Sequence, residues 1–281
     1  MERQYLKHSK NYLFMVKIVS KQSLAKRKSE PSYFELQSLW GFTKHGGGLK
    51  ATQELIELCH VDKAKYVLDV GCGVGATSCY IAKRHDCKVV GVDISERMIA
   101  QAKERAKREN VKNKVEFRVA DVQDLPFKEN TFDVVIGESI IAFLEEKEKG
   151  ITECRRVVKT GGYVGFNEGT WTKKQPPTEL IKYMSHLTGA KFETAENWKK
   201  LMENSGLEDI VVKTYKLSIL SKIDEIKMYG LKDYLRSFHR FLSLGLRSST
   251  FWVYVKEAWP PKSVFKNFFE YFGYGLYVGK K

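Results

Sequence analysis

Between residues 66 and 168, short apolar runs alternate with longer segments in which apolar residues recur at helical spacing. This alternation is typical of consecutive β-α-β units. The runs predicted to be strands are residues 66–70, 88–92, 115–119, 132–137 and 163–166. The segments predicted to be helices are residues 76–84, 95–109 and 143–158. The run Val134-Val135-Ile136 is apolar throughout, as in parallel strands covered on both faces. The pattern therefore predicts a doubly wound α/β domain.

The pattern changes after Glu168. Residues 171–177, with two prolines and two lysines, are predicted to form a loop. A helix over 194–204, ended by Gly206, and a strand over 207–215 are predicted next. Residues 221–270 are aromatic and basic with helical spacing, and residues 274–278 alternate like a closing strand.

Four domain segments follow from this order. Residues 1–45 are expected to be an N-terminal helical segment, because Leu6, Leu13, Val16 and Leu24 could share one stripe. A transit peptide is the alternative suggested by its basic, acid-poor composition. The core is predicted over 46–220, a helical lid over 221–270, and a closing strand of the core over 271–281. No apolar run approaches the roughly 18 residues that span a bilayer.

Charge and cysteines change this picture only modestly. The 281 residues carry a formal net charge of +14. This charge fits a nucleic acid, an acidic membrane surface or an anionic substrate as a partner, and equally a solvated basic surface. The five cysteines show no metal-ligand spacing. We therefore expect reduced thiols, a cytoplasmic protein that could be peripheral on a membrane, and no metal site.

A glycine loop follows the first predicted core strand. Gly71, Gly73 and Ala76 fit a dinucleotide-binding pattern, and Asp93 follows about 20 residues later, where a ribose-binding carboxylate is expected. The loop alone thus fits two cofactors. Asp69 favours one of them, since its carboxylate would repel a pyrophosphate but attract the ammonium and sulfonium groups of S-adenosyl-L-methionine.

Five motifs in order then resemble the signature of class I S-adenosylmethionine-dependent methyltransferases. They are residues 69–75 (DVGCGVG), 92–94 (VDI), 120–127 (ADVQDLPF), 132–135 (FDVV) and 156–162 (RVVKTGG). The chain is most similar to the members that act on small or lipid-like molecules, including quinone and sterol C-methyltransferases, over about residues 46–214. The resemblance implies a seven-stranded, mostly parallel sheet with an antiparallel last strand and a helical lid.

The expected cofactor site combines chemistry and resemblance. Asp69 and the backbone of the glycine loop should hold the methionine end, Asp93 should accept both ribose hydroxyls, and Ile94 and Met98 could pack on the adenine. The resemblance assigns adenine contacts to Asp121 and Val122, although Asp121 could instead cap a turn. The complete predicted set is Asp69, Gly71, Cys72, Gly73, Asp93, Ile94, Met98, Asp121, Val122 and Glu138.

Three residues are candidates for catalysis. Glu138 and Glu168 follow predicted strands at the sheet edge where open α/β sheets bind ligands, although each could be a solvated loop acid. His45 precedes three glycines and could close over the cofactor on a hinged loop, or simply be exposed. A general base is needed only for some methyl acceptors.

The aromatic and basic segment 221–270 bears on the acceptor. It suits a small hydrophobic or lipid-like acceptor, or an anionic membrane surface, unless its aromatics merely pack the lid onto the core. An RNA or protein methyltransferase is the alternative suggested by the charge, but the strand at 132–137 lacks a following Asn/Asp-Pro-Pro-Tyr-type motif, and we expect no specific nucleic-acid partner. A nicotinamide-dependent oxidoreductase and a cofactor-binding protein without catalysis also stay open, whereas arsenite methylation is disfavoured by the cysteine positions.

Overall fold

The computed structural model describes residues 45–217, 231–247, 252, 256 and 259–281. The chain divides into two compact units, residues 1–36 and 37–281, and every described residue belongs to the second. The helix predicted over residues 1–45 lies outside the described residues, apart from His45, and so do residues 221–230, 248–251, 253–255 and 257–258 of the predicted lid.

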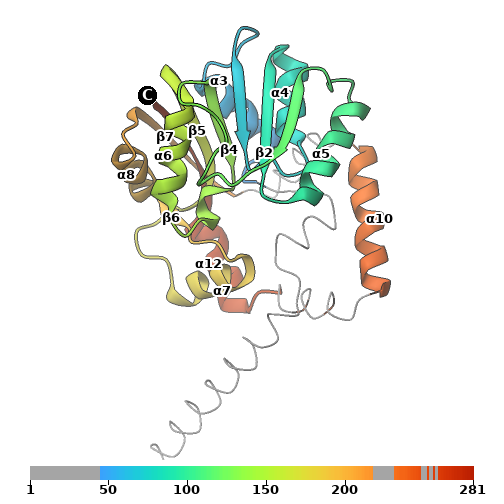
Figure 1. Cartoon of the computed structure of the whole chain (residues 1–281). Coiled ribbons are helices and arrows are strands. Elements are labelled where there is room, and N and C mark those ends of the chain that lie inside the picture. Colours follow the sequence, from blue (N-terminus) through green and yellow to red (C-terminus); the bar gives the residue numbers. More distant parts are fainter. Residues whose placement is uncertain (1–44, 218–230, 248–251, 253–255, 257–258) are drawn as a thin grey trace, which may run out of the picture. The chain divides into compact units, whose positions relative to one another are not determined.

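One mixed sheet forms the centre of the second unit (Figure 1). Its path is β3-β2-β1-β4-β5-β8-β7, and β6 pairs with β5 off this path. β8 runs antiparallel to β5 and β7, and the other pairs are parallel. The strands are β1 (Tyr66–Val70), β2 (Lys88–Asp93), β3 (Val115–Val119), β4 (Phe132–Glu138), β5 (Val158–Trp171), β6 (Glu193–Thr194), β7 (Glu208–Lys216) and β8 (Phe272–Lys280).

Helices cover both faces of this sheet, because successive strand residues point to opposite sides. Val67 and Ile136 pack with α3, α4 and α5, whereas Leu68 and Val135 pack with α6 and α8. The helices are α3 (Gly48–Leu58), α4 (Ala76–His85), α5 (Glu96–Arg108), α6 (Lys147–Val157), α7 (Thr178–Thr188), α8 (Ala195–Asn204), α10 (Leu231–Arg247) and α12 (Lys262–Tyr271), with a short 3₁₀ turn η1 (Ile141–Phe143). The doubly wound fold and the antiparallel last strand are confirmed.

Local sequence signals explain several boundaries. Ser95 caps α5, since its Oγ accepts a hydrogen bond of 3.3 Å from the backbone N–H of Met98. Thr194 caps α8 in the same way through Asn197. The prediction of a helix from residue 143 is wrong at its start: α6 begins at Lys147, because Leu144 is extended and packs against Gly150.

β5 is much longer than the predicted strand 163–166. Its second half carries the buried polar residues Asn167, Glu168 and Thr170. Because they interrupt the apolar pattern, this half was not predicted to be a strand. β8 pairs with it from Tyr163 to Trp171. The additional strand beyond the predicted seven is β6, which has two residues. In the described part of the chain, no helix combines the length and apolarity needed to cross a membrane.

The packing of α3 on β5 gives a first prediction. A Cβ added at Gly165 would lie 2.4 Å from Cys59 Sγ and 3.0 Å from a Leu55 methyl group. We expect Gly165→Ala to lower the free energy of unfolding by about 1–3 kcal/mol through overpacking. Urea denaturation checks this, with Glu57→Ala on the exposed side of α3 as the control. An unchanged midpoint for Gly165→Ala would show that α3 does not pack directly on β5.

Candidate functional site

The carboxyl ends of β1, β2 and β4 lie side by side in the sheet and carry Asp69, Asp93 and Glu138. Between β1 and α4 the chain turns through Gly71, Gly73 and Gly75, whose φ angles are 67°, 51° and 73°. These left-handed conformations favour glycine. A Cβ at Gly71 would also lie 2.8 Å from the Ile140 side chain. The sequence thus folds the glycine loop against the ends of three strands.

Asp93 fixes this loop from β2. Its two carboxylate oxygens accept hydrogen bonds of 2.9 Å from the backbone N–H groups of Gly73 and Ser95. Burial raises the pKa of this carboxyl, although the two backbone donors oppose the shift. The next side chain, Ile94, is 73% exposed, while Met98 is buried under the start of α5. An exposed apolar side chain therefore stands directly beside a nearly buried carboxylate.

Asp69 lies beneath the loop and is almost completely buried. Its Oδ2 accepts a hydrogen bond of 2.5 Å from Ser78 Oγ on α4. Burial raises its pKa to about 7, and the negative charges of Glu138 and Asp93 add to this shift. The site therefore holds three acidic groups whose charges repel one another, and a positively charged ligand would stabilise their ionised forms.

Glu138 is the centre of a buried polar network. Its carboxylate accepts hydrogen bonds from Thr52 Oγ1 on α3 at 3.0 Å and from Thr77 Oγ1 on α4 at 2.7 Å. Asn167 Nδ2 on β5 donates a third at 3.2 Å, and His45 Nδ1 lies 3.4 Å from Glu138 Oε1. The side chain of Glu138 is 5% exposed. Glu138 therefore joins four segments that are distant in the sequence.

Asn167 is a site residue that sequence reasoning missed. It is fully buried, and its Nδ2 also lies 3.1 Å from His45 Nδ1 and donates to the Gly46 carbonyl at 2.9 Å. Its Oδ1 has no hydrogen-bond partner among the described residues. The sequence signal that could have identified Asn167 is its position as a polar residue beside Glu168 in an otherwise apolar run. Thr77, in the first turn after the glycine loop, was equally visible, whereas nothing local marked Thr52.

The turn that carries His45 packs against β8 and contacts α3. Gly47 has a φ of 75°, and Gly46 and Gly47 lie against the ring of Tyr274 on β8. That ring stacks on Tyr215 of β7, with centroids 5.0 Å apart. His45 Nε2 lies 3.4 Å from Thr52 Oγ1. The structure thus brings His45 and Glu138 together, and whether they act in catalysis stays a prediction.

Glu168 points to the opposite side of β5 and is 1% exposed. Its carboxylate accepts hydrogen bonds from the backbone N–H groups of Ile140, Ile141 and Ala142 at 2.9, 2.7 and 3.4 Å. Burial raises its pKa to about 7 despite these donors. The carboxylate therefore holds the turn that follows β4, and it is not the solvated loop acid that the sequence left open.

Asp121 follows β3 and shows the turn-capping contact that the sequence left as an alternative. Its Oδ1 accepts a hydrogen bond of 2.9 Å from the backbone N–H of Gln123. Val122 is buried, and Cys72 is buried with its backbone N–H donated to Val92. The adenine contacts of Asp121 and Val122 and the cofactor contact of Cys72 stay predictions.

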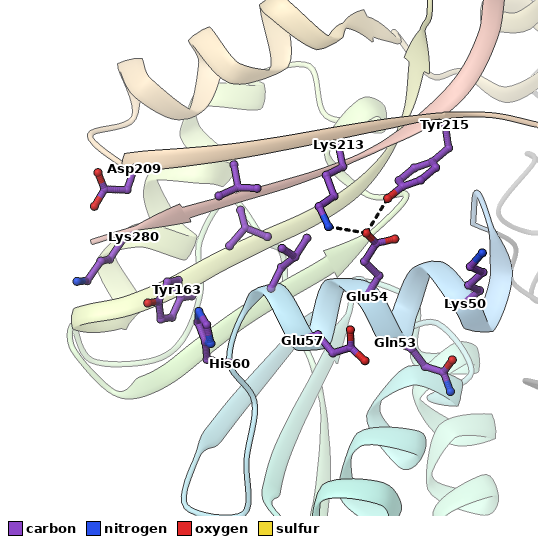
Figure 2. Close-up of a pocket in the computed structure, with 13 residues that line it drawn as sticks. Lys50, Gln53, Glu54, Glu57, His60, Tyr163, Asp209, Lys213, Tyr215 and Lys280 are labelled. Atoms are coloured by element: carbon purple, nitrogen blue, oxygen red, sulfur yellow. Dashed lines mark hydrogen bonds and ion pairs between the residues drawn. The ribbon is translucent and has the colours of Figure 1, made fainter.

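A separate cavity of about 860 Å³ lies between α3 and β7 (Figure 2). There Glu54 accepts hydrogen bonds from Lys213 Nζ at 2.7 Å and from the Tyr215 hydroxyl at 2.6 Å. None of the predicted site residues lines this cavity. Within the described ranges, no group of three or more histidine, cysteine or acidic side chains could hold a metal ion.

Comparisons with known proteins agree with this geometry. Residues 68–166 match a family described as a methyltransferase domain. Phosphoethanolamine N-methyltransferase of Triticum aestivum is 32% identical over 165 residues, which cover 59% of this chain and 32% of that protein. The chain thus spans about a third of the length of this relative. An uncharacterised Haemophilus influenzae protein is 30% identical over 179 residues, 62% of this chain and 71% of its own length.

Solved structures share the fold. Haemonchus contortus phosphoethanolamine N-methyltransferase 2, in complex with S-adenosyl-L-methionine, has a TM-score of 0.63 at 21% identity and covers 84% of this chain and 53% of its own. The [4+2]-cyclase SpnF has a TM-score of 0.66 at 19% identity and covers 86% of this chain and 89% of its own. With this sheet order and this glycine loop, the chain belongs to the S-adenosylmethionine-dependent methyltransferase family, and S-adenosyl-L-methionine is its cofactor.

Proposed function

We propose that the protein transfers a methyl group from S-adenosyl-L-methionine to a small acceptor that is hydrophobic or lipid-like, of the quinone, sterol or phospholipid type. The observation that carries the methyl-donor part is the arrangement of Asp69, Asp93 and Glu138 around a glycine loop beside the exposed Ile94. The acceptor part is supported by the aromatic segments near the end of the chain and by the small acceptors that the relatives' names state.

The residues of the site fit the cofactor. Each oxygen of Asp93 accepts one backbone N–H and, when ionised, keeps a further lone pair for a ribose hydroxyl. Ile94 offers an exposed apolar surface for the flat face of adenine. Asp69, with the loop backbone at Gly71 and Gly73, would hold the methionine end, where the ammonium group lies.

Electrostatics favour this cofactor over a nicotinamide dinucleotide. Burial raises the pKa of Asp69, and the negative charges of Glu138 and Asp93 already add to this shift. A pyrophosphate would add negative charge to this cluster, whereas ammonium and sulfonium groups would offset the existing charge. The charge of the site therefore disfavours the oxidoreductase alternative, and the RNA or protein methyltransferase alternative has only the net charge of +14 in its favour.

The cofactor supplies a methyl group activated on a sulfonium sulfur, and its transfer is an in-line displacement by the acceptor. The work of the protein is then to align the acceptor and to exclude water. Glu138 and His45, 3.4 Å apart, would take a proton from an acceptor that loses one. Glu168 would act as a positioning residue, since three backbone N–H groups already occupy its carboxylate.

Some of the aromatic residues near the end of the chain pack against the core, and others are exposed. Phe268 of α12 packs against the cluster of Trp171 and Phe272, so part of this segment stabilises the core, as the sequence left open. Phe265 and Phe269 on the same helix are 59% and 41% exposed. Among the relatives and similar structures, the stated substrates include phosphoethanolamine, ajmaline and geranyl diphosphate, which are small molecules. Together these observations support a small acceptor with an apolar part.

Asp69 gives a prediction that separates stability from function. The raised pKa means that ionising Asp69 destabilises the fold, so this contribution to stability is complete below about pH 4 and is lost as pH rises through about 7. We expect Asp69→Asn, which keeps an oxygen for Ser78, to raise the free energy of unfolding at pH 8 by about 1 kcal/mol or more. Denaturant unfolding between pH 5 and 8 measures this, and an unchanged pH dependence would contradict it.

Ile94 gives a prediction about cofactor binding. Because its side chain is 73% exposed, Ile94→Ala should leave the free energy of unfolding within about 0.5 kcal/mol of wild type. It should weaken the binding of S-adenosylhomocysteine by about five- to thirtyfold, through lost apolar contact with adenine. Calorimetry measures the affinity of Ile94→Ala and of wild type for S-adenosylhomocysteine. Val211→Ala, at a 43% exposed position on β7, is the control. Equal affinity of Ile94→Ala and wild type would place the adenine elsewhere.

The acceptor class is tested by transfer of a radiolabelled methyl group into a cell extract, followed by separation into lipid, nucleic-acid and protein fractions. We expect label in the lipid and small-molecule fractions. Asp93→Ala, which loses the carboxylate expected to hold the ribose, should lower this labelling at least about a hundredfold. Label found only in RNA or protein would overturn the proposed acceptor.

A further inference from the structure

Helix α10 carries an unusual apolar surface. Leu235, Phe238, Leu242 and Leu246 recur at spacings of three and four residues, which places them along one side of the helix. Their side chains are 56%, 53%, 49% and 88% exposed. A helix on the surface of a globular protein ordinarily turns such a stripe toward the core. We name these four residues the α10 stripe, and we infer that it docks the protein onto an anionic lipid bilayer.

The contact between α10 and the core explains why the stripe is exposed. Arg240 Nη1 donates a hydrogen bond of 2.7 Å to Gln101 Oε1 on α5, and Figure 1 shows the two helices side by side. At 100° per residue, Arg240 lies well over 90° around the helix from Leu235, Phe238 and Leu242. The helix is therefore attached through its polar side while its apolar side faces outward.

The charge of α10 favours an anionic membrane as the partner of the stripe. The helix contains Lys232, Arg236, Arg240 and Arg247 against one acid, Asp233. On a helical wheel these basic residues lie outside the stripe, toward the side of the helix that carries Arg240. A basic amphipathic helix with Leu and Phe on its apolar side is the pattern of helices that lie in the interface of an anionic membrane.

Other exposed side chains, in the part of the chain that follows α10, fit this partner. Trp252 and Trp259 are 56% and 81% exposed, and Lys256 and Lys262 nearby in the sequence are exposed as well. Indole rings favour the boundary between lipid headgroups and acyl chains, and lysines favour anionic headgroups. Each would add to the attraction toward the same kind of surface.

A second copy of this chain fits the stripe less well. Self-pairing through α10 would bring two basic helices together in a protein whose net charge is already +14. An anionic lipid surface offsets that charge and takes up the exposed leucines and phenylalanine. The inference deepens the proposed function and rests on it for the lipid-like acceptor, which would be reached from such a surface.

The test is sedimentation of the full chain with lipid vesicles. Vesicles of phosphatidylcholine alone are compared with vesicles that contain added phosphatidylglycerol, at low and at high salt. We expect binding to the anionic vesicles and a steep fall with salt, because the attraction between charges is screened. Leu242→Glu should weaken binding at least about tenfold, since it removes one leucine that the bilayer would bury and adds a negative charge. Val211→Glu, at a similarly exposed apolar position on β7, should bind like wild type.

Several outcomes would overturn the docking surface. They are no binding to anionic vesicles at low salt, equal binding by Leu242→Glu and wild type, or self-association of the chain that Leu242→Glu abolishes while vesicles fail to bind. Calorimetry with S-adenosylhomocysteine on the same proteins keeps the two proposals separate. If cofactor binding is normal and vesicle binding absent, only the docking surface fails, and if vesicles bind without cofactor, only the proposed function fails.

Discussion

The structure depends on a buried negative charge that the fold itself does not neutralise. Asp69 is almost fully enclosed near the end of the interior strand β1, and its carboxylate accepts hydrogen bonds from the hydroxyl and the backbone N–H of Ser78. Burial and the neighbouring acids raise its pKa to about 7. Such a group reduces stability whenever it is ionised, so its presence at the centre of the sheet is best explained by a ligand that brings positive charge. The glycine loop and the beginning of α4 are arranged around that position.

The polar network at Glu138 connects this centre to the rest of the site. Through Thr77 it reaches the first turn of α4, and through Thr52 and His45 it reaches the glycine turn before α3. Asn167 completes it from β5. An unsatisfied member of a buried polar network lowers the stability of the fold, so a change in one of these segments affects the positions of the others. Binding at the glycine loop and the position of His45 are therefore physically linked.

The sequence predicted those features that local patterns determine. The bounds of β1 and β3 and the turn at the glycine loop each depend on a few consecutive residues, and the structure confirms them. The length of β5 was missed, because Asn167, Glu168 and Thr170 are polar and their burial depends on β8, more than a hundred residues later. The partners of Glu138 were missed for the same reason: Thr52 precedes it by 86 residues, and no local pattern connects them. Glu168 was predicted as a candidate catalytic acid at the sheet edge, but its burial and its three backbone partners could be seen only in the folded chain.

The central claim, that a cationic cofactor compensates the charge of Asp69, is tested most directly by counting the protons released on binding. Calorimetric titration of the full chain with S-adenosyl-L-methionine near pH 7, in buffers that differ in ionisation enthalpy, measures that number. The account predicts a release of roughly half a proton, since a group with a pKa near the working pH is half protonated and a bound cation lowers that pKa. Binding with no proton release, or with proton uptake, would contradict it.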